Sequence, residues 1–236
     1  MNIIEEEETI PVKVGVGWVV LEREQGLWVP KVKRKNILTQ FGLTGIASAP
    51  SGTYTPPVYL VIDSTHTALT ATYSSGVTSI QTTADPTLVG DTQLVLGVGL
   101  ASQETVTFTA KSGSGPYTFT LSPATVNSHT SGDPVVRAVT ANDTLASVVT
   151  EAQYDPTFAP GLRAIQAANY SPAIGQNTMQ FFISGIQATN LFFAHVGLAD
   201  APGVGAGSLH NYASFGYNHT NVNDIEIDIT WTMTTS

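Results

Sequence analysis

Three acidic side chains alternate with isoleucines near the end of the chain, at Asp224, Glu226 and Asp228. On a β-strand such positions point to one face and lie about 7 Å apart. Two carboxylates in this arrangement could act as acid and base, and all three are weak candidates for a calcium site. The plainer interpretation is a solvated face, or a face that meets a basic neighbour. The sequence favours it, because calcium ligands usually come from a tight loop that contains glycine.

The histidines lack the spacing of known metal motifs. They are His66, His129, His195, His210 and His219. No pair is separated by the four residues of a helical zinc site, and the chain has no cysteine, which excludes disulfides and thiolate zinc sites. We expect His195, in an apolar strand, to be a core residue, and His129 to close a turn. No metal or cofactor is predicted.

His66 lies close to Asp63 and Ser64, which suggests a hydrolase triad. A nucleophilic serine would need a strained Gly-x-Ser-x-Gly turn, and the sequence contains none. The glycine-rich stretches at 113–115 and 203–207 are not followed by the Gly-Lys-Ser/Thr of a phosphate loop. We therefore predict no catalytic residue and a protein that is not an enzyme.

Aromatic residues beside the glycine-rich loop offer a different kind of site. Tyr212, Phe215 and Tyr217 could stack on the sugar rings of a glycan if they were exposed. The alternative is that they belong to a β-core or a subunit contact.

The elements that would position these residues are mainly β-strands, because apolar and polar residues alternate along much of the chain. Strands are expected at 12–22, 27–33, 58–62, 77–83, 91–96, 103–111, 116–122, 134–139, 162–168, 177–184, 190–198 and 225–234. The first two should form a hairpin. Short helices are expected at 36–48, capped by Asn36, and at 143–153, capped by Asp143.

The predicted fold class is mainly β, with an antiparallel β-sandwich-like outer domain, one or two short helices and an inserted small β module. The outer domain is discontinuous, covering residues 12–70 and 140–236. The module covers the Thr-rich residues 71–139, because insertion at an exposed loop is well tolerated. Residues 1–11 form an N-terminal arm.

Composition and charge exclude several classes of function. Charged residues make up 11% of the chain and the net charge is −9, yet six of the nine basic residues lie within residues 1–35. The remainder cannot form the basic face of a nucleic-acid-binding protein. The acidic start does not resemble a signal peptide, and the apolar runs are too short to span a bilayer, so we expect a soluble protein without membrane contact.

Two parts of the chain resemble structural proteins of tailed bacteriophages. The sequence Lys-Asn-Ile-Leu-Thr-Gln-Phe-Gly-Leu at 35–43 and the strand at 58–63 are similar to a helix and strand of that family. The segments 142–151 and 192–198 are similar to its later motifs, although His195 stands where an acid is usual. The resemblance implies a virion component with the sandwich described above, assembled in the host bacterial cytoplasm.

The predicted insert resembles small β modules of phage head and tail proteins. The similar segments are 90–97, which begins Gly-Asp, then 103–106, and then 128–135, which contains His-Thr-Ser-Gly. The resemblance does not distinguish a head position from a neck or tail position.

A shortage of lysine indicates that the protein works in an assembly. Residues 36–236 contain a single lysine, Lys111, although lysine normally protects strand edges from association. The expected partners are other copies of the chain and other virion proteins. The expected assembly contacts are Glu5, Glu6, Glu7, Glu8, Lys31, Lys33, Arg34 and Lys35. Deletion of residues 1–30 should leave a folded domain that no longer joins its assembly.

Two classes of function remain open from the sequence. The first is a non-enzymatic structural subunit of the virion, in the tail or baseplate or as a capsid decoration protein. The alternative is a receptor-binding or adhesin-type module that recognises host-surface glycan. A cell-wall hydrolase is a third idea, which lacks a catalytic motif.

Overall fold

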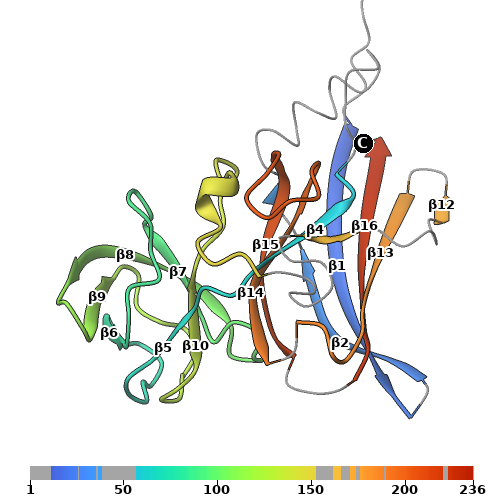
Figure 1. The fold of residues 1–236 in the computed structure, drawn as a ribbon. Coiled ribbons are helices and arrows are strands. Elements are labelled where there is room, and N and C mark those ends of the chain that lie inside the picture. The colour runs from blue at the N-terminus through green and yellow to red at the C-terminus, as the bar shows by residue number, and fades with distance from the viewer. Residues whose placement is uncertain are drawn as a thin grey trace, which may run out of the picture.

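The computed structural model describes residues 12–25, 27–35, 37–38, 57–152, 162–165, 171–173, 176–188, 190–219 and 223–235. They form three antiparallel sheets and one short 3-10 helix, so the fold is mainly β (Figure 1). The predicted arm at 1–11 lies outside the described residues.

Sheet A joins the two ends of the described chain. In spatial order its strands are β12 (Ser171–Ala173), β13 (Gln176–Ile183), β16 (Ile225–Thr235), β1 (Val12–Glu24) and β2 (Leu27–Lys35). The predicted hairpin of β1 and β2 is confirmed, with a bulge after Val20. The alternation of β16 is also confirmed, because Ile225, Ile227 and Ile229 are fully buried while the acids between them are not.

Sheet B packs against sheet A and completes a sandwich. Its strands, in order, are β11 (Ala164–Ile165), β4 (Tyr59–Asp63), β14 (Leu191–Ala199), β15 (Leu209–His219) and β3 (Ile37–Leu38). One apolar core fills the space between the sheets, including Trp18 and Phe181 from sheet A and Phe193 and Phe215 from sheet B.

The third sheet is built entirely from residues 67–137 and curls into a nearly closed barrel. Its strands, in order, are β5 (Thr67–Ala68), β10 (Pro134–Arg137), β7 (Gln93–Leu96), β8 (Glu104–Ser112), β9 (Tyr117–Leu121) and β6 (Ser79–Thr82). A bridge between Leu69 and Thr82 brings its two ends together. The barrel has a core of its own around Ile80, Leu94 and Phe119.

The barrel lies beside the end of the sandwich formed by β14 and β15 (Figure 1). A small apolar cluster fills the junction, with Val95, Val98 and Val136 from the barrel side and Ala194 from β14. Because the chain leaves the sandwich after β4 and returns to it after β10, the polar groups at this junction link segments that are distant in sequence.

The predicted helices need correction. Ile37 and Leu38 form strand β3, and the rest of the predicted helix at 36–48 lies outside the described residues. Within 143–152, only Leu145–Ser147 is helical, as one 3-10 turn. Thr144 caps this turn by accepting from the Ala146 N–H at 3.3 Å, whereas the predicted cap Asp143 binds Arg137.

The structure changes the expectation for deletion of residues 1–30, which we now expect to unfold the sandwich. Strand β1 lies inside sheet A, paired with β16 on one side and β2 on the other. Its Trp18 and Val20 are fully buried in the sandwich core. Any test of the arm must therefore stop before Val12.

Candidate functional site

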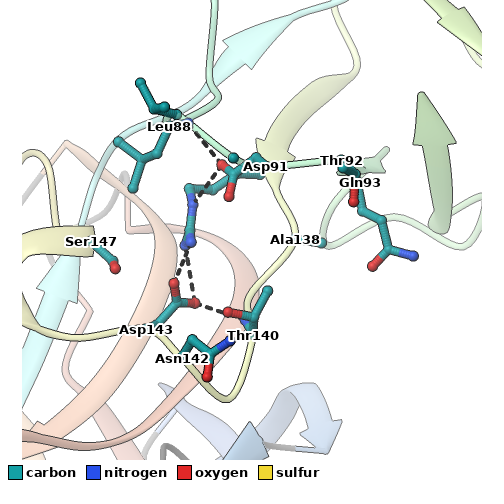
Figure 2. Close-up of a pocket in the computed structure, with 12 residues that line it drawn as sticks. Leu88, Asp91, Thr92, Gln93, Ala138, Thr140, Asn142, Asp143 and Ser147 are labelled. Atoms are coloured by element: carbon teal, nitrogen blue, oxygen red, sulfur yellow. Dashed lines mark hydrogen bonds and ion pairs between the residues drawn. The ribbon is translucent and has the colours of Figure 1, made fainter. Parts of the chain in front are cut away.

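A polar pocket of about 360 Å³ opens where the barrel meets the connection back to the sandwich. The loop before β7 forms one wall, and the end of β10 with the turn that follows it forms the other (Figure 2). Its lining residues are Leu88, Val89, Gly90, Asp91, Thr92, Gln93, Arg137, Ala138, Thr140, Asn142, Asp143 and Ser147.

Arg137 is the charged centre of this pocket and is only 3% exposed. Its Nε lies 3.1 Å from Asp91 Oδ2, and its two terminal nitrogens donate to the two carboxylate oxygens of Asp143. Burial alone would lower the pKa of Arg137, but the neighbouring Asp143 and Asp91 raise it above its ordinary value. The guanidinium is therefore held as a cation between two carboxylates.

The two carboxylates also fix the backbone on either side. Asp91 accepts the Leu88 N–H at 2.8 Å, and Asp143 accepts the Thr140 N–H at 2.7 Å. Two acids and one arginine leave the site with excess negative charge, which disfavours an anionic ligand. The ion pairs of Arg137 with Asp91 and Asp143 join the loop before β7, the end of β10 and the turn after it, and we call this group the arginine clamp.

A second polar centre lies inside sheet B, around Asp63 at the end of β4. Asp63 is 1% exposed and accepts the Tyr212 hydroxyl at 2.8 Å and the Thr65 N–H at 2.9 Å. His195 Nδ1 lies 3.5 Å from the same carboxylate, while His195 Nε2 lies 3.0 Å from the Arg137 carbonyl oxygen. This centre therefore connects the sandwich to the barrel.

Electrostatics at Asp63 favour its charged form. Burial by itself would raise the pKa of Asp63, but contact with His195 and hydrogen bonds from Thr65 lower it to about 2. Burial, and then the adjacent Asp63 charge, raise the pKa of Tyr212 well above its ordinary value. Both side chains are enclosed by the fold, and their hydrogen bond joins β4 to β15.

The serine-hydrolase arrangement considered from the sequence does not form. His66 Nδ1 lies 2.9 Å from the Ser64 carbonyl oxygen, and its ring packs on Phe192 with centroids 4.4 Å apart. Asp63 points instead toward Tyr212 and His195.

The other histidines are buried and bonded within the fold. His129 Nε2 lies 2.8 Å from Glu104 Oε1, and His210 Nε2 lies 3.3 Å from Asp200 Oδ2. His219 contacts the carbonyl oxygens of Ala188 and Asn223. Among the described residues, no group of three or more His, Cys, Asp or Glu side chains could hold a metal ion.

The weak metal candidates at and just before β16 separate into two environments. Asp224 lies 3.7 Å from Arg23 and accepts the Gly185 N–H at 3.0 Å. Glu226 and Asp228 are neighbours on the outer face of sheet A. Burial, followed by the nearby Asp228, raises the pKa of Glu226, and burial likewise raises the pKa of Asp228. The three carboxylates do not converge on one point.

The predicted glycan contact at Tyr212, Phe215 and Tyr217 is wrong. The first two side chains are fully buried and the third is 8% exposed. Strand β15 lies between β14 and β3 in sheet B; Phe215 and Tyr217 pack in the sandwich core, and Tyr212 packs in a separate apolar cluster with Val61 and Leu209. A ring without an exposed face cannot stack on a sugar.

The predicted assembly residues lie partly within the structure. Lys31 forms ion pairs with Glu24 and, at 3.8 Å, with Glu22 on the neighbouring strand. Lys33 is exposed on β2, which also contains Arg34 and Lys35. Glu5, Glu6, Glu7 and Glu8 lie outside the described residues.

Sequence reasoning missed the arginine clamps. Arg163 is 4% exposed, pairs with Glu151, and donates to the carbonyl oxygens of Ala201 and Ala206. A signal was present, because residues 36–236 contain only Arg137 and Arg163 as arginines. Isolated arginines next to apolar strands in so weakly charged a chain favour buried, paired positions.

No protein-family model matches the chain, and no curated protein is significantly similar to it. Among the described residues there is also no helix with the length and hydropathy needed to cross a membrane. Any functional assignment therefore depends on the chain's own residues.

Proposed function

We propose that this protein is a non-enzymatic structural subunit of a tailed-bacteriophage virion, which contacts neighbouring subunits through its β-sheets. The observation that carries the proposal is that the buried ionic groups bind partners within the same chain. Arg137, Arg163, Asp63 and His129 are each bound to other parts of the same chain.

Each of these contacts joins segments that are distant in sequence. Arg163 and Glu151 hold the loop that contains Ala201 and Ala206, and Arg137 joins β10 to the loop before β7. A catalytic site needs at least one reactive group that faces a substrate. The buried groups named above are instead bound within the chain: His129 and Glu104 brace the barrel, Arg163 and Glu151 hold a sandwich loop, and His195 joins β14 to the Arg137 carbonyl of β10, which suits a rigid building block.

Two further observations support a role in assembly. Strand β2 is hydrogen-bonded on one side only among the described strands, and such an edge is a site for association. Large apolar side chains are also exposed near it, including Leu27 at 72% and Trp28 at 38%. The resemblance to phage structural proteins then suggests the virion as the assembly.

The test is quantitative mass spectrometry of purified phage particles, with tailless heads analysed in parallel. We expect a fixed number of copies of this chain per particle, and retention or loss with the tail would give its position. Absence of the chain from purified particles would refute the proposal.

A further inference from the structure

The outer face of sheet A, which points away from sheet B, carries its charges in separate strips. Directly opposed residues on neighbouring strands share a face. Strand pairing aligns Lys33 on β2 with Val19 on β1, Val19 with Asp228 on β16, and Asp228 with Gln180 on β13. Across the sheet, this row therefore contains a basic residue, an apolar residue, an acidic residue and an amide, in that order.

The next row on the same face has the same arrangement of apolar and acidic groups. Leu21 on β1 is opposite Glu226 on β16, which is opposite Phe182 on β13. Phe182 is 42% exposed, and its ring meets that of Trp28 with centroids 6.4 Å apart. The face therefore has a half-buried apolar strip along β1 and aromatic rings at one end.

The acidic strip lacks basic partners within the described chain. Neither Glu226 nor Asp228 forms an ion pair with a described lysine or arginine. The Gln180 amide donates to Glu226 Oε1 at 3.4 Å and also hydrogen-bonds Asp228. Asp228 Oδ1 is buried without a hydrogen-bond partner. Burial raises the pKa of both carboxyls, so a nearby cation would relieve an unfavourable environment.

We propose that this face is a self-complementary interface, on which a second copy of the chain packs face to face about a two-fold axis parallel to β1. Such a rotation reverses the order of strands across the sheet and preserves position along them. It places β2 of each copy over β16 of the other, so Lys33 meets Asp228 twice. Val19, on the axis, meets its own counterpart, as an isologous interface requires.

The charges favour this partner over another orientation of the same chain. A two-fold axis perpendicular to the strands would place each strip on itself, with acid against acid. Other described cations are placed elsewhere: Arg23 pairs with Asp224, Lys31 with Glu22 and Glu24, and Lys111 with Asp85, while Arg137 and Arg163 are buried. By strand register, Lys33 is the cation that this rotation brings to Asp228.

This inference deepens the proposed function by naming one partner, and it can fail independently, because the dimer is measured on the purified chain without particles. Sedimentation velocity at low ionic strength and pH 7 should detect a dimer. Lys33→Glu and Asp228→Lys should each weaken it about tenfold or more, because each creates two like-charge contacts. The double variant should return to within about threefold of the wild type.

Lys111→Glu on the barrel is the matched control for Lys33→Glu, since both lower the net charge by about two, and it should leave the dimer intact. A crosslinking test avoids variants that alter the charge of β16. The chain has no cysteine, and opposed sheets pack about 10 Å apart. Val19→Cys should therefore give covalent dimers with a short bis-maleimide reagent, whereas Val126→Cys on the barrel should not.

A monomer at all concentrations would overturn the proposal. A dimer that tolerates both charge reversals, or Val19→Cys chains that do not crosslink, would also overturn it. The acidic residues Glu5–Glu8 are the competing partner for Lys33. Restoration of the Lys33→Glu dimer by changing those four residues to lysine, but not by Asp228→Lys, would assign the contact to the arm and refute the face-to-face packing.

Discussion

Buried polar residues in this protein depend on partners from other strands. Asp63 lies at the end of β4, yet its carboxylate is matched by Tyr212 from β15 and backbone N–H groups at Thr65 and Thr150. An ionised carboxylate inside a protein is tolerated only when such donors replace water. Several segments therefore bind Asp63 at once, and the stability of the fold should depend on whether its carboxyl is ionised.

We predict that Asp63→Asn changes the pH dependence of stability. The pKa of Asp63 lies near 2 in the fold against an ordinary value of 3.8, so its stabilising contribution exists above pH 4 and disappears as the pH falls toward 2. Urea unfolding should show the wild type losing about 2 kcal/mol more than the variant between pH 5 and pH 2. Parallel curves for the two proteins would contradict this.

The elements show which features can be predicted from sequence. The β1–β2 hairpin and β16 follow from local alternation, because a half-buried strand imposes a period of two on its own residues. Asp143 was predicted as a helix cap from equally local information. That prediction failed because its carboxylate binds Arg137 on β10, and local sequence does not report contacts between elements.

The candidate site was less predictable than the fold for the same reason. The centre around Asp63, His195 and Tyr212 brings together three strands of sheet B, and no spacing in the sequence indicates it. The aromatic residues of β15 were ambiguous, since alternation does not say whether a strand is central or lies at an edge. The order of strands in the sheet decides whether a strand is central, and that order depends on pairing between residues that are distant in sequence.

Loss of the arginine clamp should destabilise the protein strongly. Arg137→Met would leave Asp91 and Asp143 buried without their cation, and we expect the free energy of unfolding to fall by about 3–5 kcal/mol. Arg23→Met is the control, because Arg23 is half exposed and 3.7 Å from Asp224, so its loss should cost less than about 1 kcal/mol. Equal effects of the two substitutions in urea unfolding would exclude the clamp.

Two glycines set how closely the barrel approaches the sandwich. A Cβ on Gly99 would lie 1.9 Å from the Gly216 carbonyl oxygen. Gly99→Ala should therefore force the two bodies apart. Gly76 is a matched control, with φ of +85° against +87° at Gly99 and nothing within 4 Å of its Cβ position.

We predict that Gly99→Ala lowers stability by about 2 kcal/mol more than Gly76→Ala, since both strain the backbone but only the first overpacks a contact. Chemical denaturation of the two variants measures the difference. Similar losses would show that the junction yields easily and that the barrel is loosely attached.

At the scale of the whole molecule, the sandwich is closed by strands from both ends of the described chain. β16 is paired with β1 over its full length, from Thr235 opposite Val12 to Ile225 opposite Glu22. The segment between β4 and β14 contains the whole barrel. Composition predicted a β-rich chain, but this pairing of distant strands determines how far the chain can be shortened.

Two truncations separate the arm from the fold. Removal of residues 2–11 spares every described strand, so we expect an unchanged circular dichroism spectrum and a melting temperature within a few degrees of the full chain. Removal of residues 2–24 deletes β1, takes Trp18 and Val20 from the core, and leaves β16 and β2 without their shared neighbour. That chain should be unfolded and rapidly digested by protease.

The shorter truncation also separates two modes of association. If the acidic residues Glu5–Glu8 contact a neighbouring subunit in the particle, the chain lacking residues 2–11 should be depleted from virions. It should still dimerise in solution, because Lys33, Val19 and Asp228 are intact. Normal incorporation into particles, measured by mass spectrometry against the full-length chain, would exclude the arm from assembly and leave the face of sheet A as the remaining candidate contact.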